Sequence, residues 1–334
     1  MRDVRLVQLQ RSGQRAVAIV EGDALVLLHE VRSAYGLADQ AAEEGEPLAE
    51  IACQLAKGDR LDYDAIYTGT GDWRLLPCWD HPDEPARCLV TGTGLTHQAS
   101  ADNRQAMHEL EPAELTDSMK MYRWGLEGGR PAPGCIGVAP EWFFKGVGTV
   151  LCAHGQPLTV PPFGESGGEE PEIAGCYFVD AKGRPRRVGF ATANEFSDHA
   201  LEKRNYLYLA PSKLRECALG PELCISADFE DVRGEVCIER DGQTLWFAAI
   251  ATGEANMCHS LANLEHHHFK YPQHRRPGDA HVHFLGADAF SYGTGVELRA
   301  GDRMVVQWSG FGRPLVNPLC VARERQTLVK VQPL

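Results

Sequence analysis

From residue 88 onward the chain consists of short apolar runs separated by glycine-rich turns, and no other feature limits its possible folds as strongly. The runs include "IAGCYFV", "VGFATAN", "ELCIS" and "EVCIE". Short runs of this kind, bounded by Gly, Pro, Asn and Asp, are typical of strands. Long helical periodicity is scarce in this part of the chain. The sequence therefore predicts a mainly β (α+β) body with few helices.

Residues 1–85 form a different pattern. The segments "VRLVQLQ", "RAVAIVEG" and "ALVLLHE" read as three short strands separated by turn residues. Residues 30–58 have the composition and period of one or two amphipathic helices, and residues 75–88 form a proline-rich linker. We therefore expect a small N-terminal α+β domain over residues 1–85, followed by the main domain over residues 86–334.

Composition and charge bear on the environment and on partners. The chain has 334 residues, 43% of them hydrophobic, which is enough to bury a substantial core. Its net charge of −13, without a basic stripe, argues against nucleic-acid and anionic-membrane partners. No run approaches twenty apolar residues, and the start "MRDVRLVQLQ" lacks a signal-peptide core. The eleven cysteines are scattered singly through apolar runs, which favours reduced thiols and a cytoplasmic protein.

The stretch "GGEEPEIAG" places three glutamates directly before an apolar strand. Glu170 and Glu172 are two apart, so on a strand their side chains point to the same face. Pro171 between them lacks an N–H and indicates a strand start or an edge. Two carboxylates on one face repel each other unless a cation lies between them, and oxygen-only ligands suit Mg²⁺, Mn²⁺ or Ca²⁺.

A third acidic ligand is available where the run "VGFATAN" ends, because Glu195 follows it directly. The alternative is that all these glutamates are solvated turn residues. A second segment, Arg123–Gly137, holds five glycines and two prolines and is predicted to be a loop, serving as a lid or a binding segment.

The order and spacing of several motifs resembles the fumarylacetoacetate hydrolase superfamily. The relevant stretches are "EWFFKGVGTVLCAHGQPLTVPPFGESGGEEPEIAG", "GFATANEFSD", "APSKLRECALGPEL" and "GTGVELRAGDRMVVQWSGFG". The resemblance covers about residues 88–320. It implies a fumarylacetoacetate hydrolase-like mixed β-roll catalytic domain behind a small N-terminal domain. It also implies an assembly as a homodimer or higher homo-oligomer, and a divalent metal, Mg²⁺ with Mn²⁺ or Ca²⁺ as alternatives.

The resemblance also implies roles for individual residues. Glu170, Glu172 and Glu195 would bind the metal, although the family usually has aspartate where this chain has Glu195. Lys213 matches the family lysine beside the metal and is the expected catalytic residue. The expected substrate contacts come from the Phe-x-Lys strand, the closing motif and the segment after Glu195: Lys145, Ser309, Gly310, Glu202 and Tyr206.

His97 falls where the family carries the histidine of a His-Glu pair. The glutamate expected three residues later is Ser100, and Asp102, Glu109 and Glu114 are the possible replacements. The missing carboxylate weakens the case for a water-activating pair. We keep His97 as a candidate catalytic residue.

Two reactions fit a metal that binds a 2-oxo acid: hydrolytic C–C cleavage of acylpyruvates, and loss of a 4-hydroxyl from 2-keto-3-deoxy sugar acids. The broken His-Glu pair and the segments "GTGLTHQASADNRQAMH" and "PEWFFKG" favour the dehydratase, which resembles a branch acting on pentose-derived acids. The expected reaction converts 2-keto-3-deoxy-pentonate, such as the arabonate, to 2-oxoglutarate semialdehyde and water. Lys213 or a nearby base would take the C3 proton, and His97 or a histidine of the His266–His283 segment would protonate the leaving hydroxyl.

The segment "NLEHHHFKYPQHRRPGDAHVHF" holds six histidines and raises a competing possibility. His281 and His283 would share one strand face, and histidine-rich tracts can bind zinc. We instead predict an inserted loop or an interface, because no cysteine or Glu-x-x-His pattern frames a zinc site. A zinc hydrolase and a metal-bearing sugar-acid sensor without turnover stay as the alternatives from the sequence.

Overall fold

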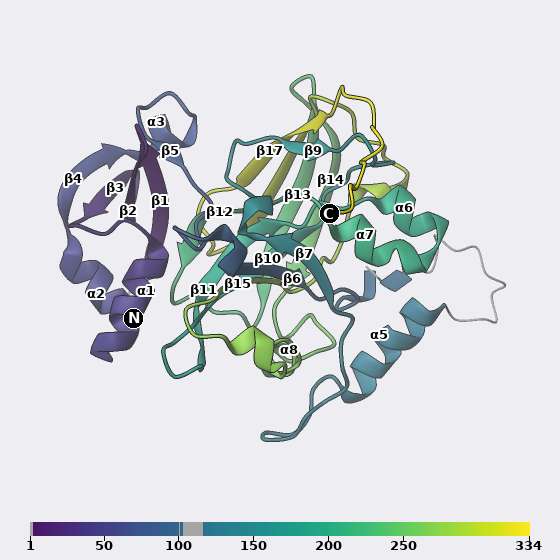
Figure 1. Ribbon diagram of the computed structural model, residues 1–334, viewed down its shortest axis with the longest axis horizontal. Helices are drawn as coiled ribbons and strands as arrows, with labels where there is room; N and C mark the ends of the chain where they lie inside the picture. The colour runs from purple at the N-terminus through teal and green to yellow at the C-terminus, as the bar shows by residue number, and fades with distance from the viewer. Residues whose placement is uncertain (1–2, 100, 103–115) are drawn as a thin grey trace.

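The computed structural model describes residues 3–99, 101–102 and 116–334, and two β-sheets dominate it (Figure 1). The mainly β fold expected from the short apolar runs is confirmed. Within the described residues, no helix is both long enough and apolar enough to cross a membrane.

The N-terminal strands and helices agree with the sequence pattern, and they lie on the left of Figure 1. The strands are β1 (Arg5–Arg11), β2 (Gln14–Glu21), β3 (Ala24–Leu28), β4 (Ala56–Asp62) and β5 (Arg74–Leu75). The helices are α1 (Ala34–Glu44), α2 (Leu48–Leu55) and α3 (Tyr63–Tyr67). Ser33 starts α1, because its hydroxyl accepts a hydrogen bond from the backbone N–H of Gly36 at 3.0 Å.

The larger sheet has twelve strands and runs through both parts of the chain. Its main order is β4-β3-β2-β1-β12-β11-β10-β15-β6-β7, with β5 beside β1 and β8 beside β12. The strands from the second part are β6 (Cys88–Gly92), β7 (Phe143–Val147), β8 (Leu151–Cys152), β10 (Pro171–Val179), β11 (Pro185–Asn194), β12 (Cys217–Cys224) and β15 (Ala280–Phe284). Because β1 pairs with β12, one hydrogen-bonded sheet crosses the predicted domain boundary. The division at residue 85 stays a prediction.

The smaller sheet has five strands in the order β14-β13-β16-β17-β9. Its strands are β9 (Leu158–Val160), β13 (Val232–Arg240), β14 (Gln243–Thr252), β16 (Arg303–Trp308) and β17 (Leu315–Val321). Apolar side chains of this sheet, such as Val236 and Val306, pack against Ile173 and Phe190 of the larger sheet. The two sheets therefore share one core.

The helical pieces of the second part are short. They are α5 (Asp117–Gly128), α6 (His199–Arg204), α7 (Leu209–Lys213) and α8 (Leu261–Phe269), with 3₁₀ turns η1 (Pro85–Arg87), η2 (Gly148–Val150), η3 (Tyr206–Tyr208), η4 (Pro272–Arg275) and η5 (Ser291–Thr294). Figure 1 shows α6 and α7 together on the right and α8 in the lower centre.

The two runs "IAGCYFV" and "VGFATAN" lie at the centre of the larger sheet, as expected. They belong to β10 and β11, which pair with each other antiparallel. All nine residues of β10 are buried, and Pro171 is its first residue. Since Pro171 faces Asn194 in the register, the start of β10 meets the end of β11.

The prediction of a loop over Arg123–Gly137 was wrong for its first part, which belongs to α5. Thr116 starts this helix by accepting a hydrogen bond from the N–H of Met119. Gly125 is a packing residue here, because a Cβ atom would lie 2.6 Å from the Cys258 sulfur. The glycines that suggested turns thus permit close approach of α5 to its neighbours.

Candidate active site

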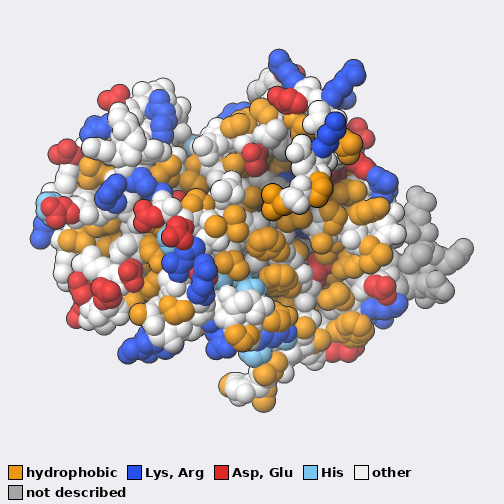
Figure 2. Space-filling model, in the orientation of Figure 1, with side chains coloured by type: hydrophobic (Ala, Val, Ile, Leu, Met, Phe, Trp, Pro, Cys, Tyr) orange, Lys and Arg blue, Asp and Glu red, His pale blue; other side chains and the backbone are white. Residues whose placement is uncertain are grey.

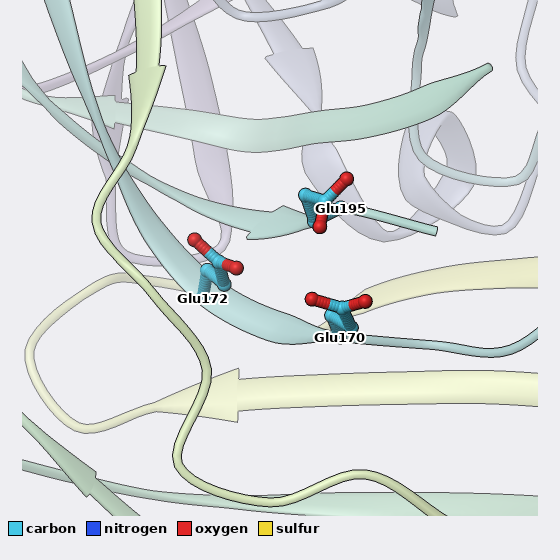
Figure 3. A group of neighbouring side chains, drawn as sticks. All are labelled: Glu170, Glu172 and Glu195. Atoms are coloured by element: carbon cyan, nitrogen blue, oxygen red, sulfur yellow. The ribbon is translucent and has the colours of Figure 1, made fainter. Parts of the chain in front are cut away.

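Three buried glutamates meet where β10 begins and β11 ends (Figure 3). Glu170 directly precedes β10, Glu172 is its second residue, and Glu195 directly follows β11. One carboxylate oxygen from each lies within 4.8 Å of the others, and no other such group of His, Cys, Asp and Glu occurs in the part of the chain that the structure describes. The predicted trio is therefore brought together.

The local backbone explains why the three carboxylates converge. The N–H of Glu195 donates to the carbonyl of Glu170 at 2.9 Å, which extends the hairpin ladder by one step. The side-chain oxygen of Asn194 accepts from the N–H groups of Glu170 and Phe196, at 3.2 Å each. Asn194 thus closes the end of the ladder and turns both flanking chains so that their acidic side chains face each other.

Two lysines form ion pairs with the carboxylates of Glu170 and Glu195. Lys213 donates to Glu170 at 2.6 Å and to Glu195 at 2.7 Å. Lys145, on β7, donates to the other oxygen of Glu195 at 2.6 Å and to the carbonyl of Phe196 at 2.9 Å. Both ammonium groups are buried, so these pairs are shielded from solvent and fix the carboxylate of Glu195 in place.

Negative charge remains in excess at the site, and the pKa values report it. Burial, followed by the charges of Glu195 and Glu170, raises the pKa of Glu172 well above its ordinary value. Burial and the charge of Glu170 raise the pKa of Glu195 to about 7. Burial raises the pKa of Glu170, but Lys213 and His199 lower it by more, so the pKa of Glu170 lies well below the ordinary value.

This donor set fits a hard divalent cation. Carboxylate oxygens are the preferred ligands of Mg²⁺, Mn²⁺ and Ca²⁺, and a cation would relieve the repulsion that raises the pKa values of Glu172 and Glu195. Glu170, Glu172 and Glu195 are the residues that would hold it. One oxygen of Glu172 is oriented by the N–H of Gly286 at 2.6 Å, and the indole of Trp308 donates to its carbonyl at 3.0 Å.

Glu202 and Tyr206 reach the same region from the segment that follows Glu195. The carboxylate of Glu202 accepts from the hydroxyl of Ser212 at 2.7 Å and lies 3.3 Å from the ammonium of Lys213. Tyr206 donates to Glu141 at 2.6 Å.

Sequence reasoning missed Glu141, which is 5% exposed. It lies two residues before Phe143, whose ring is 5.0 Å from the ammonium of Lys213. A Cβ atom on Gly94 would lie 1.8 Å from a Glu141 oxygen, so that glycine makes room for the carboxylate. The acidic residue inside the apolar stretch "PEWFF" is the signal that could have found it.

The structure does not bring His97 together with the carboxylates. Its ring nitrogens lie 2.9 Å from the hydroxyl of Thr96 and 3.1 Å from that of Thr252. Burial lowers the pKa of His97 to about 3, so the imidazole is neutral at pH 7. Asp102 instead accepts from Gln98, and the other proposed partners, Glu109 and Glu114, lie outside the described residues, as does Ser100. A catalytic role for His97 stays a prediction.

Ser309 and Gly310 lie in an exposed turn after β16. They line a surface depression of about 300 Å³ together with Asp228 and Asp231. Among the described residues, no hydrogen bond links them to the three glutamates. Their predicted substrate contact therefore has no geometric support within one copy of the chain.

The first glutamate of "GGEEPEIAG" has a different partner. Glu169 is fully buried and accepts from the N–H of Ser291 at 2.6 Å and from its hydroxyl at 2.8 Å. Burial raises its pKa despite these bonds. Glu169 therefore anchors η5 and is not a member of the trio.

The histidine segment forms a helix and a strand of the larger sheet in the structure, not an inserted loop. His268 lies on α8, and His281 and His283 lie on β15, facing it. His268 and His281 share a hydrogen bond of 3.0 Å, and both nitrogens of His283 lie 2.8 Å from threonine hydroxyls. The prediction of an inserted loop was wrong because α8 packs these imidazoles into the interior, where they are at most 1% exposed.

Comparison with known proteins gives one curated relative and a set of solved structures. No protein-family model matches the chain. A probable 2-keto-3-deoxyxylonate dehydratase of Haloferax volcanii is 30% identical over 140 residues. That match covers 40% of this chain and 47% of the relative, so the chain matches less than half of the relative's length.

A solved structure of 2-keto-3-deoxyarabinonate dehydratase superposes with a TM-score of 0.72 at 20% identity, covering 96% of this chain and all (100%) of the other. The chain has the fold of this dehydratase. The fold resemblance to the sugar-acid branch, inferred from the motifs, is thereby confirmed. A structure of 2-keto-3-deoxy-D-arabinonate dehydratase complexed with magnesium and 2,5-dioxopentanoate gives 0.70 at the same identity and coverage. A 5-carboxymethyl-2-hydroxymuconate delta-isomerase from Mycobacterium smegmatis gives 0.58 at 16% identity, with the same coverage, so the dehydratase fold is shared more widely.

Proposed function

We propose that the protein is a Mg²⁺-dependent hydro-lyase that dehydrates 2-keto-3-deoxy-pentonates to 2-oxoglutarate semialdehyde, which is 2,5-dioxopentanoate. The observation that carries this proposal is the buried trio of Glu170, Glu172 and Glu195 with two lysines on the dehydratase fold. The curated relative named as a 2-keto-3-deoxyxylonate dehydratase, and the neighbour complexed with magnesium and 2,5-dioxopentanoate, support the choice of substrate and metal.

The cation, when bound, would withdraw electron density from the 2-oxo group of the substrate and so make the C3 proton acidic. Lys213 is the base that accepts that proton in this proposal. Its ammonium lies 3.3 Å from Glu202, which can accept a proton and leave a neutral amine. The amine then takes the C3 proton: the C3–H bond breaks, an N–H bond forms, and the electron pair moves onto the 2-oxo group.

The leaving hydroxyl at C4 needs a proton before it departs as water. We propose that the hydrogen-bonded pair of Glu141 and Tyr206 donates it, since Glu141 lies two residues before Phe143, whose ring is 5.0 Å from the ammonium of Lys213. The C4–O bond breaks while the electrons of the enolate form a C3=C4 bond. Loss of a C5 proton and protonation at C3 then give the C4=C5 enol, which tautomerises to the aldehyde of 2,5-dioxopentanoate. A neutral His97 held between two hydroxyls is a poorer donor. Lys145 keeps the carboxylate of Glu195 oriented.

We also propose a homodimer in the cytoplasm. All eleven cysteines lie within the described residues as free thiols, which suits a reducing compartment. Exposed hydrophobic side chains gather over β7, η3 and the end of α7, where α7 contacts both β7 and η3, and Figure 2 shows this face. They are Phe144, Leu207, Tyr208 and Leu214. Soluble monomers seldom expose apolar patches of this kind, so a second copy is the expected cover.

The test is an assay of the purified protein with Mg²⁺ against 2-keto-3-deoxy-arabonate, 2-keto-3-deoxy-xylonate and an acylpyruvate. We expect 2,5-dioxopentanoate from a sugar acid, detected by mass spectrometry, and loss of turnover when EDTA removes the metal. Turnover of the acylpyruvate alone would make the protein a C–C hydrolase and overturn the proposal.

A further inference from the structure

His199 contacts the metal-binding trio without belonging to it. It is 1% exposed, and its Nε2 atom lies 2.9 Å from one oxygen of Glu170. The ammonium of Lys213 lies 2.6 Å from that same oxygen. Two donors on one oxygen favour the second oxygen of Glu170 as the atom that binds a cation.

The ring of His199 has no other polar partner to compete with Glu170. Its Nδ1 atom is buried and makes no hydrogen bond within the described residues. A Cβ atom on Gly168 would lie 2.5 Å from this nitrogen, so the backbone of Gly168 closes that side of the ring. The Nε2–H tautomer, which donates to Glu170, is therefore the one that the surroundings select.

Aromatic neighbours fix the plane of the ring. Phe290 stacks on His199 with 4.8 Å between centroids and 16° between planes, and Tyr292 lies at 5.2 Å. Phe290 is held in turn, because the next residue, Ser291, donates twice to the buried carboxylate of Glu169. Glu169 thus supports the ring that contacts Glu170.

The same segment also orients a second ligand directly. Gly286, in the loop between β15 and η5, donates its N–H to Glu172 at 2.6 Å. One loop, residues 285–290, therefore controls Glu172 through the backbone and Glu170 through Phe290 and His199.

We infer that His199 is a positioning residue that orients Glu170 toward the cation, with its own orientation set by Phe290. The inference rests on the proposed metal-dependent function and adds a residue to it. A carboxylate that can rotate must be ordered each time that it binds a cation, whereas one held by a fixed donor is already in place. Loss of such an outer partner typically weakens metal binding by about 10- to 100-fold.

The experiment measures Mn²⁺ binding to the EDTA-stripped protein by electron paramagnetic resonance. His199→Phe keeps the ring stacked on Phe290 and removes the donor, so we expect Mn²⁺ affinity to fall by about 10- to 100-fold. His199→Gln restores a donor at the Nε2 position, so its affinity is expected within about threefold of the wild-type value. His154→Phe is the matched control, because His154 also stacks on an aromatic ring, Tyr67, and makes no contact with the trio.

The outcomes separate this inference from the proposed function. If His199→Phe binds Mn²⁺ as tightly as the wild type, or if both His199 variants lose affinity equally, the positioning role is wrong, whatever the turnover. If the wild type binds Mn²⁺, His199→Phe binds it weakly, and no sugar acid is consumed, the positioning role stands and the dehydratase proposal falls. A wild-type protein that binds no Mn²⁺ overturns both.

Discussion

The buried histidines make the stability of the fold sensitive to acid, and His281→Asn tests this. Burial, followed by the charge of His274, lowers the pKa of His281 to about 3, while Asp279 acts weakly in the other direction. The folded protein therefore keeps His281 neutral between pH 7.5 and pH 5.5. In the unfolded chain the pKa of histidine is about 6.5, so the unfolded state takes up a proton across that interval. The free energy of unfolding that depends on neutral His281 is therefore highest at pH 7.5 and decreases as the pH falls.

The size of the loss follows from this proton uptake. One histidine that is neutral when folded costs about 1.4 kcal/mol of stability between pH 7.5 and pH 5.5. His283 and His97, whose pKa values are also about 3, act in the same direction. Together the three amount to about 4 kcal/mol, a large part of a typical folding free energy of about 5–15 kcal/mol. Glu195 opposes them, because its raised pKa of about 7 lets the folded state take up a proton in the same interval.

Comparing His281→Asn with the wild type cancels the contribution of Glu195, because both proteins contain that residue. Asparagine at position 281 keeps a polar atom near the nitrogen that bonds His268, and the other nitrogen of His281 has no partner to lose. Urea unfolding followed by tryptophan fluorescence at pH 7.5 and pH 5.5 gives the pH-dependent loss for each protein. His281→Asn should lose about 1.4 kcal/mol less than the wild type, and His29→Asn, at a side chain 66% exposed, should match the wild type. Equal losses in His281→Asn and the wild type would refute the reasoning.

Three further predictions concern the candidate site. Glu172→Gln should abolish Mn²⁺ binding and turnover while leaving the melting temperature equal or higher, because it removes one of three repelling carboxylates; calorimetry and Mn²⁺ titration check this. Lys213→Met should lower turnover by about 10²- to 10⁴-fold and should also stop deuterium exchange at C3 in D₂O, followed by NMR. Glu141→Gln should lower turnover by a similar factor, about 10²-fold or more, but should keep C3 exchange, since only the departure of the hydroxyl is impaired. Loss of exchange in Glu141→Gln would move that residue to the first step.

The glutamate trio could be predicted from the sequence because its geometry is mostly local. Glu170 and Glu172 are set by the start of β10, and a hairpin brings Glu195 beside them through a single register, Pro171 opposite Asn194. Alternating strand geometry and the chemistry of oxygen ligands were sufficient for that step. The N-terminal strands and helices could likewise be predicted from the spacing of their apolar residues.

The residues that sequence reasoning missed depend on contacts between distant segments. Glu141 accepts a hydrogen bond from Tyr206, which is 65 positions away in the sequence. The ring of His199 is oriented by stacking on Phe290, which lies on another loop. The segment that holds His281 was predicted to be an inserted loop or an interface because no zinc-site pattern frames it, yet α8 packs against the imidazole of His281. No period or spacing encodes which of these segments pack together.

The continuous large sheet has a consequence for the catalytic body. A shortened protein starting at residue 86 would lose β1 and leave the backbone of Leu223 and Cys224 in β12 without that strand as a partner. It would also strip Glu222, which is fully buried, of its bonds from Arg5 and Tyr63. The N–H of Arg313 would still donate to Glu222, but the loss of two of its partners beside an exposed strand edge favours aggregation over folding. The first 85 residues thus complete the large sheet and supply hydrogen-bond partners to buried groups in the rest of the chain.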